Sequence, residues 1–497
     1  MNYLFSRVLE ITTLYDSVKP SSLNKMAHET LVLACHEGLK GSGQAYGNLF
    51  SQVDFLCRKC NVRLSDRIAV QAMRRHTNGV EQVEKADFMY DMRALCRFIS
   101  AVTGDDVPGE LLRVLPADDK THDRVEGLDV RYVRCIVRSW DEGYAYVSAE
   151  KGLEGRLLAV DLSDEDLVYV RKMLREGMQM NLLDCKIDNL PHSISTAPDG
   201  TESVVVPGLV VVEPDYLVDI SSIAACFKEY GHHPLSYVLE RMRPRANSSA
   251  ILLGNLAGGV LDDIINEDEA FSLAETLRSN FADKALEYCS CTDFDAARFK
   301  EDIKTQAVNI REAVKVMFAE YDRSRVVLEP SFVCERLGLQ GRVDLMTTDF
   351  RLLVEQKSGK NRNVETGRAG GHGSMQLEPH YVQLLLYYGV LRYNFNLGYD
   401  RTDIRLLYSK YPSERGLMAV AFYQKLFREA LKLRNEIVAT DFFIAREGFE
   451  RILPVLTPER INTAGLDNSF YHTWLLPKIE AVTEPLRNLE PLERGEF

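Results

Sequence analysis

The sequence has no long apolar run, and this absence argues against a chain that crosses a bilayer. Its longest apolar stretch, residues 204–212, is interrupted by Pro207-Gly208, whereas a transmembrane helix needs about 20 consecutive apolar residues. The start of the chain contains Arg7 and Glu10, which break the apolar core that a signal peptide requires. We therefore expect no membrane partner and a cytoplasmic location.

Cysteine is used sparingly. The chain of 497 residues has 10 cysteines scattered along it, and without an export signal we expect their thiols to be reduced. Cys57 and Cys60 form a C-x-x-C pair, but no second close pair follows nearby, and a structural zinc site needs a further pair of ligands. The cysteines thus predict neither a disulfide framework nor a zinc site.

Basic residues are outnumbered by acidic ones. With 60 Lys and Arg against 73 Asp and Glu, the net charge is -13, which argues against a protein that coats nucleic acid with a generally basic surface. A local basic groove remains compatible with this charge. The apolar fraction of 45% and the charged fraction of 27% are ordinary for a globular protein, and the length predicts about three or four domains.

The apolar pattern divides the chain into four regions. Residues 1–117 show the three- and four-residue spacing of helices. Residues 122–217 form short Val-rich segments between turn signals, with one helical insert at 163–176, which predicts a small barrel of the oligonucleotide/oligosaccharide-binding (OB) type. Residues 218–412 mix helices and strands, and 413–497 return to helix. The predicted fold class is α/β in the core and α+β over the multidomain chain.

Within the third region, the predicted order is helix, three strands, helix, strand. We expect helices at 235–243, 250–265, 270–289, 296–321 and 375–395, and strands at 326–329, 340–346, 352–356 and 404–408.

Charged residues interrupt two of these apolar strands. Asp344 lies in one, and Glu355 and Lys357 lie in the next; an isolated carboxylate in such a strand is costly unless it binds something. Because strand side chains alternate, Glu355 and Lys357 point to the same face. Two carboxylates beside an ammonium group fit a site for a hard cation with a neighbouring charge-stabilising lysine.

Further polar residues flank these strands. Glu329 ends the preceding strand, and the following helix carries Gln383 and Tyr387, which are four residues apart and share one face. His380 precedes Gln383 by three residues and joins that face.

Asp344, Glu355-x-Lys357 and Gln383-x-x-x-Tyr387 together resemble the signature of the PD-(D/E)XK nucleases. The Gln-x-x-x-Tyr element is similar to that of the RecB-like branch, which includes RecB-type recombination enzymes, CRISPR-adaptation exonucleases and replication nuclease–helicases. The resemblance covers about residues 250–410. It implies a restriction-endonuclease-like core, with a mixed sheet flanked by helices.

The resemblance implies a metal-dependent nuclease that hydrolyses DNA phosphodiester bonds, in repair, recombination or defence. Asp344 and Glu355 would bind Mg²⁺ or Mn²⁺ together with the backbone carbonyl of Gln356, and Glu329 would be an accessory acid. Lys357 would orient or help deprotonate the attacking water and stabilise the developing charge.

The same resemblance implies that Gln383 and Tyr387 position the active-site strand or the substrate phosphate. His380 is expected to be a phosphate-facing or a structural residue.

A basic, glycine-rich loop follows Lys357. Lys360, Arg362, Arg368 and His372 lie in it, and beside a phosphodiester site such a loop either contacts the DNA backbone or is simply solvated. Ser358-Gly359-Lys360 does not complete a P-loop because Val354 stands where that motif requires glycine.

Two residues depart from the family pattern. Gly258 stands where the first core helix usually carries a histidine, and Asp262, one turn further on, is a candidate substitute ligand. No cysteine follows Cys334, so the iron–sulfur cluster of some relatives cannot be completed and none is expected.

Two interpretations therefore stay open. Because the core of replication nuclease–helicases is followed by a helicase, the nuclease interpretation implies a helicase or ATPase as a partner, or as a missing C-terminal domain. The alternative is a catalytically weakened nucleic-acid-binding or scaffold subunit, which the glycine at position 258 favours.

Overall fold

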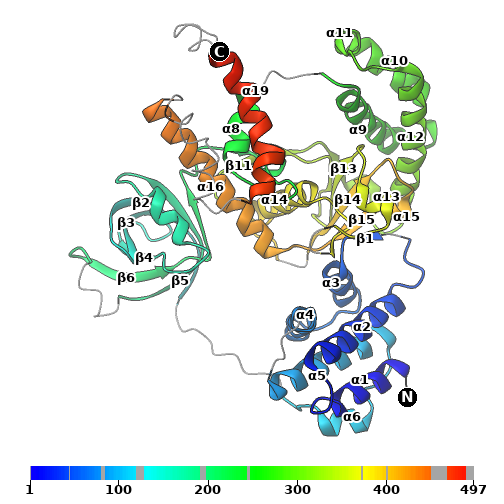
Figure 1. Cartoon of the computed structure of the whole chain (residues 1–497), viewed down its shortest axis with the longest axis vertical. Helices are drawn as coiled ribbons and strands as arrows, with labels where there is room; N and C mark the ends of the chain where they lie inside the picture. Colours follow the sequence, from blue (N-terminus) through cyan, green and yellow to red (C-terminus); the bar gives the residue numbers. More distant parts are fainter. Residues whose placement is uncertain are drawn as a thin grey trace.

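The computed structural model describes residues 2–43, 45–79, 84–118, 128–190, 197–242, 247–370, 373–398, 401–448, 451 and 467–487. In Figure 1 the N-terminal helices lie at the bottom, a β-barrel at the left and a larger sheet with its helices at the centre and right. The described ranges form three sheets and many helices, so the predicted α+β class is confirmed.

The N-terminal region is helical. Its helices α2 and α5 bury Leu31, Leu95 and Phe98 against one another, because apolar residues recur along one face of each. The helices are α1 (Tyr3–Thr13), α2 (Pro20–Gly38), α3 (Leu49–Lys59), α4 (Leu64–Thr77), α5 (Lys85–Thr103) and α6 (Gly109–Val114).

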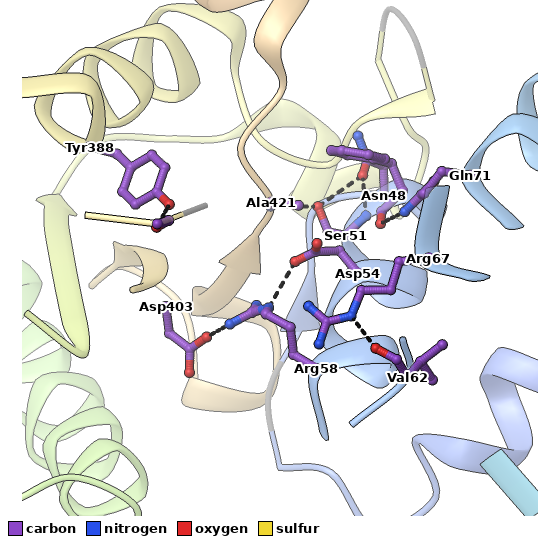
Figure 2. A network of polar contacts seen from close by, with 12 residues as sticks. Asn48, Ser51, Asp54, Arg58, Val62, Arg67, Gln71, Tyr388, Asp403 and Ala421 are labelled. Atoms are coloured by element: carbon purple, nitrogen blue, oxygen red, sulfur yellow. Dashed lines mark hydrogen bonds and ion pairs between the residues drawn. The ribbon is translucent and has the colours of Figure 1, made fainter. Parts of the chain in front are cut away.

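One short strand joins this region to the central sheet. Strand β1 (Ala45–Tyr46) pairs in parallel with β15 (Leu417–Val420). Next to it, Ser51 Oγ on α3 accepts a hydrogen bond from Ala421 N at 3.0 Å. Figure 2 shows Arg58 of α3 reaching Asp403 on the sheet. Neither strand was predicted: β1 lies in the region expected to be helical, and so does β15, whose four residues are buried by pairing with β14.

The predicted β-rich region contains a closed barrel of five strands. Strand β2 pairs with both β3 and β5, and β4 pairs with β6, so the order β2-β3-β4-β6-β5 returns to β2. The strands are β2 (Leu128–Trp140), β3 (Tyr144–Lys151), β4 (Leu157–Asp161), β5 (Gln179–Asn189) and β6 (Thr201–Val206).

The helical insert of the barrel is shorter than the predicted 163–176. A 3₁₀-helix, η1 (Val168–Met173), stands there instead. The backbone N–H groups of Ser163 and Asp166 donate to the side chains of Asp161 and Asp164, both at 2.8 Å. Such local side-chain bonds offer the backbone an alternative to the helix.

Helix α16 (Gln424–Glu447) covers the open edge of strand β7 (Leu209–Val212), which among the described strands pairs only with β5. Asn435 on α16 donates to Val210 O at 2.8 Å and accepts from Val212 N at 3.1 Å. The Asn435 side chain thus supplies the hydrogen bonds that a neighbouring strand would otherwise make to these buried backbone groups.

The central sheet has the order β1-β15-β14-β13-β12-β9. Strands β13 and β14 are parallel and are connected through helix α14 (Glu378–Phe395), whereas β12 is antiparallel to both β13 and β9. The strands are β9 (Val326–Leu328), β12 (Leu345–Thr347), β13 (Leu352–Lys357) and β14 (Asp403–Tyr408).

The strand predicted at 340–346 is two strands. β11 (Leu339–Arg342) pairs with β10 (Ser331–Cys334) and β8 (Val218–Asp219) in a separate three-stranded sheet. The chain then leaves that ladder at Val343 and Asp344 before β12 begins.

Side-chain alternation on β13 separates two cores. Leu352 and Val354 pack with α9 (Ser249–Glu267) and α12 (Ala296–Phe318), and Leu353 packs with α14 on the opposite face. The face of the sheet to which each β13 side chain points therefore follows from its position along the strand.

The helix predicted at 270–289 is two helices, because the chain turns at Lys284 and brings Tyr288 onto Phe281 with ring centroids 4.3 Å apart. The remaining helices are α7 (Ile220–Ala225), α8 (Leu235–Met242), η2 (Asp268–Ala270), α10 (Leu273–Asp283), α11 (Ala285–Ser290), η3 (Arg323–Arg325), α13 (Arg362–Thr366), α15 (Ser413–Gly416), α18 (Asn468–Phe470), η7 (Tyr471–Leu475) and α19 (Leu476–Arg487). Among the described helices, none is both long and apolar enough to cross a membrane.

Arg434 on α16 offers a test of how the barrel is attached. Its fully buried guanidinium donates to four backbone carbonyls, so Arg434→Ala should leave buried acceptors unpaired and lower the free energy of unfolding by about 3 kcal/mol or more. Those acceptors are Val212 O, Glu213 O, Tyr216 O and Gly338 O. Denaturant unfolding measures the loss. Arg446→Ala, on the exposed end of the same helix, is the control and should change stability by less than about 0.5 kcal/mol.

Candidate active site

Strand β13 and helix α14 bring three predicted residues into one hydrogen-bonded group. Lys357 Nζ donates to Glu355 Oε1 and to Gln383 Oε1, both at 2.8 Å. Gln383 Nε2 in turn donates to Glu355 Oε1 at 2.7 Å. The alternation of β13 places Glu355 and Lys357 on the face that α14 covers, as predicted, and Gln383 joins them there.

Asp344 approaches the same group from the short segment between β11 and β12. Its Oδ2 accepts a hydrogen bond from Gln356 N at 2.5 Å, and its own carbonyl accepts from Glu329 N at 2.9 Å. Burial raises the pKa of Asp344, while the Gln356 N–H and Lys357 oppose that shift. The two carboxylates therefore lie close enough for Asp344 to raise the pKa of Glu355 as well.

Glu355 is a buried carboxyl group with spare acceptor capacity. Its residue is 3% exposed, and Oε2 has no hydrogen-bond partner among the described residues. Burial, followed by the nearby Asp344, raises the pKa of Glu355 to about 8, and Lys357 opposes this shift. An orphaned carboxylate oxygen next to a second carboxylate is the donor chemistry that Mg²⁺ or Mn²⁺ takes.

Gln356 points to the other face of β13. Its Nε2 donates to Ala257 O of α9 at 3.1 Å, which fastens that helix to the active-site strand. The side chain is therefore structural, and the proposed metal ligand at this position is its backbone carbonyl, which stays a prediction.

Helix α9 presents one face to the carboxylates. Gly254 lies against Ser358, because a Cβ added at Gly254 would come within 3.3 Å of Ser358 Oγ. At Gly258 there is more room, since an added Cβ would meet no atom within 4 Å. Asp262 follows at the same four-residue interval. Burial, then Glu329 and Asp344, raise the pKa of Asp262 to about 7, so this residue lies in the electrostatic reach of the site.

Glu329 lies at the exposed rim. Its backbone has a positive φ of 49°, and its carboxylate forms an ion pair with Arg342 at 3.0 Å. Among the described residues, no group of three or more His, Cys, Asp and Glu side chains is arranged to hold a metal ion. The acids around Asp344 and Glu355 are thus close, but they do not form a preassembled cage in this part of the chain.

Tyr387 hydrogen-bonds the backbone next to the site. Its OH donates to Arg342 O at 2.6 Å, and its ring occupies the space beside Gly341, where a Cβ would approach Tyr387 Cε1 to 2.9 Å. Tyr387 therefore fixes the end of β11 just before Asp344, and its predicted role in positioning the active-site strand or the substrate phosphate stays a prediction.

His380 is half-buried beside Tyr408, with Nδ1 3.1 Å from the tyrosine OH. Burial, then Lys357 and Lys228, lower its pKa to about 3, so its imidazole is neutral at physiological pH. The nearby Lys228 was not predicted, because no local pattern marks a lysine that approaches the site from a distant segment.

The basic loop after Lys357 is anchored more firmly than a plain loop. Asn361 is fully buried, and its Nδ2 donates to Met375 O at 2.9 Å. Arg362 begins α13 and forms an ion pair with Glu229 at 3.1 Å, whereas Lys360 and Arg368 are exposed. His372 lies outside the described residues, and the predicted DNA contacts of this loop stay predictions.

Gln306 on α12 supports the site from behind and was also not predicted. Its Nε2 donates to Ser358 O at 3.2 Å, and its Oε1 accepts from Ser409 Oγ at 2.6 Å. A polar residue on the buried face of a helix was the available signal.

In comparisons with protein-family models and with curated proteins, no family model and no curated protein matches this chain. The interpretation of the site therefore depends on its geometry and on the motif resemblance.

Glu355→Gln tests the raised pKa. As pH rises from the ordinary value of 4.5 to about 8, the unfolded carboxyl ionises while the folded one keeps its proton, so this group makes wild-type stability fall by up to about 1.4 kcal/mol per pH unit. Glutamine does not titrate. The melting temperature of Glu355→Gln relative to wild type should therefore be higher at pH 8 than at pH 5.

Glu301→Gln is the control, because Glu301 is exposed on α12 and has no raised pKa to relieve. A difference between wild type and Glu355→Gln that is equal at both pH values would contradict a raised pKa at Glu355.

Proposed function

We propose that this chain is a divalent-metal-dependent deoxyribonuclease with a PD-(D/E)XK core of the RecB-like branch. The observation that carries the proposal is the buried group of Asp344, Glu355, Lys357 and Gln383, in which Glu355 Oε2 has no described partner. A polar group buried without partners is costly, and a bound cation would remove that cost.

The arrangement of the core supports this proposal. Strand β13 pairs antiparallel with β12 and parallel with β14. Helix α14 connects the parallel pair, and helices pack on both faces of the sheet. A mixed sheet with helices on both faces is what the resemblance to a restriction-endonuclease-like core implies, so this arrangement supports the proposal. The barrel order, with η1 between β4 and β5, supports an OB-type module, and such modules bind single-stranded nucleic acid.

The chemistry assigned to the residues follows from their positions. A bound Mg²⁺ or Mn²⁺ supplies a more acidic water and polarises the scissile phosphate. Asp344 and Glu355 provide the carboxylate oxygens for that ion. Lys357, held by Gln383, presents an ammonium group that orients water and offsets the negative charge that develops on the phosphate. Tyr387 keeps the Asp344 segment in register through Arg342 O.

A non-catalytic nucleic-acid-binding or scaffold subunit is the second candidate. Gly258 favours it, because the histidine ligand usual in the resembled family is missing. A helicase or ATPase partner also belongs to the proposal, and co-purification from native cells without either would count against that part of it.

Cleavage of end-labelled single- and double-stranded DNA tests the proposed activity. The wild-type chain should cut with Mg²⁺ or Mn²⁺ and not with EDTA. Asp344→Asn and Lys357→Ala should each lower the rate by at least about 100-fold, since each removes a ligand or a charge that stabilises the transition state.

Glu301→Gln and Lys304→Ala form the matched control, because this acid and lysine are exposed on α12 and pair only at the surface. They should cut at the wild-type rate. DNA and metal binding without any cleavage would instead support the scaffold.

Gly258→His tests whether α9 can supply the missing ligand. The position has room for a Cβ and lies on the helix face shared with Gly254 and Asp262. An added imidazole there should tighten Mn²⁺ binding by about tenfold, the effect of one modest ligand. Calorimetric titration with Mn²⁺ measures it.

Gly259→His is the matched control, because Gly259 also has open space but lies about 100° further round the helix. Equal gains in Mn²⁺ affinity from both variants would show that Gly258 does not face the site.

A further inference from the structure

A cavity of about 670 Å³ opens between the N-terminal helices and the central sheet. Its walls come from the segment after α2, from α3, from the end of α12 and from the residues that begin β13 and β14. Glu355 and Lys357 lie toward the other end of β13, about 13–20 Å from Arg351 at roughly 3.3 Å per strand residue. The cavity is therefore separate from the candidate active site.

Cations dominate the charge of this cavity. Five basic side chains line it against two carboxylates, which are Lys40, Arg58, Lys59, Arg351 and Arg401 against Glu320 and Asp403. In a chain with a net charge of -13, this local excess is opposite in sign to the whole protein and favours an anionic ligand.

Both carboxylates already have partners. Asp403 forms an ion pair with Arg58, as Figure 2 shows, and accepts the hydroxyl of Tyr321. Glu320 pairs at 2.8 Å with Arg405, which is 1% exposed. These contacts leave neither acid free to neutralise the remaining cations.

Three cations of the lining have no carboxylate partner. Within the part of the chain that the structure describes, Lys59, Arg351 and Arg401 form no ion pair, and Arg351 instead lies 5.9 Å from the ring centroid of Tyr321. They come from the end of α3, from the turn before β13 and from the segment just before β14, so three separate segments converge on one space.

The cavity also has an apolar wall. Phe55, Val316 and the ring of Tyr321 line it. Behind the wall, Arg405 stacks on Tyr321 at 5.1 Å, and its Nε and Nη1 are buried without described partners. An aromatic and aliphatic surface beside clustered cations suits a ligand that combines a flat ring with phosphate.

We propose that this cavity binds a free nucleoside phosphate. Its phosphates would contact Lys59, Arg351 and Arg401, and its base would lie against Phe55. The volume falls in the range of about 300–1,000 Å³ that small-molecule sites occupy. The site uses no P-loop and does not depend on the proposed nuclease activity.

Calorimetric titration of the full chain with ADP tests this site. EDTA is present so that no divalent metal can hold phosphate at Asp344 and Glu355. ADP should bind saturably with one equivalent per chain. Lys59→Glu and Arg401→Glu should each weaken binding at least about tenfold, because each replaces a charge-assisted contact with repulsion.

Arg298→Glu is the charge-matched control, because Arg298 is exposed on α12 outside the cavity, and it should leave ADP affinity within about twofold. Pyrophosphate should bind about tenfold more weakly than ADP because it lacks the base. Absence of saturable ADP binding, equal affinity for pyrophosphate, or equal loss in the control would overturn the proposal. So would cavity-dependent binding of an eight-nucleotide oligothymidylate in the absence of ADP binding.

Discussion

The buried guanidinium of Arg434 is the interaction on which the arrangement of the molecule depends. From helix α16 it donates to Glu213 O and Tyr216 O in the connection between β7 and β8, and to Gly338 O in the β10–β11 turn. Gly338 has a φ of +61°, and a Cβ there would come within 2.2 Å of Arg434 Nη2. A single cation therefore joins α16 to two other segments, the β7–β8 connection and the β10–β11 turn.

That junction extends to the candidate site. Strand β11 runs from the turn at Gly338 to Arg342, whose carbonyl accepts a hydrogen bond from Tyr387, and Asp344 follows two residues later. The position of the first carboxylate is thus set by a hairpin fixed at both ends. A buried acid that must face another acid needs such support, because mutual repulsion and desolvation would otherwise separate them.

The candidate site also shows a conflict between stability and chemistry. Burial raises the pKa of Glu355, and its Oε2 lacks a described partner. Lys357 and Gln383 compensate in part by sharing the other oxygen. Native structures tolerate such unsatisfied groups mainly where a function requires them. The buried group is therefore a stronger indication of a functional site than the exposed basic loop is.

Side-chain periodicity made a large part of this arrangement predictable. The two-residue repeat of β13 placed Glu355 and Lys357 on one face of the strand, and the helical repeat of α14 fixed which face of that helix carries Gln383. The same reasoning put Tyr387 beside Gln383 but could not show that its hydroxyl binds Arg342 O, since that contact depends on where β11 ends. The edge strand β1 was likewise hidden, because two residues carry no periodic signal and form a strand only when β15 is beside them.

The sequence by itself determined which residues share a face, because alternation along strands and helices follows from local backbone geometry. Only the tertiary structure decided which faces meet. The approach of Asp262 to Asp344, the crossing of Gln356 to α9 and the convergence of Lys59, Arg351 and Arg401 on one cavity join segments far apart in the chain. Such contacts depend on packing of whole elements, and no local pattern encodes the distance between them.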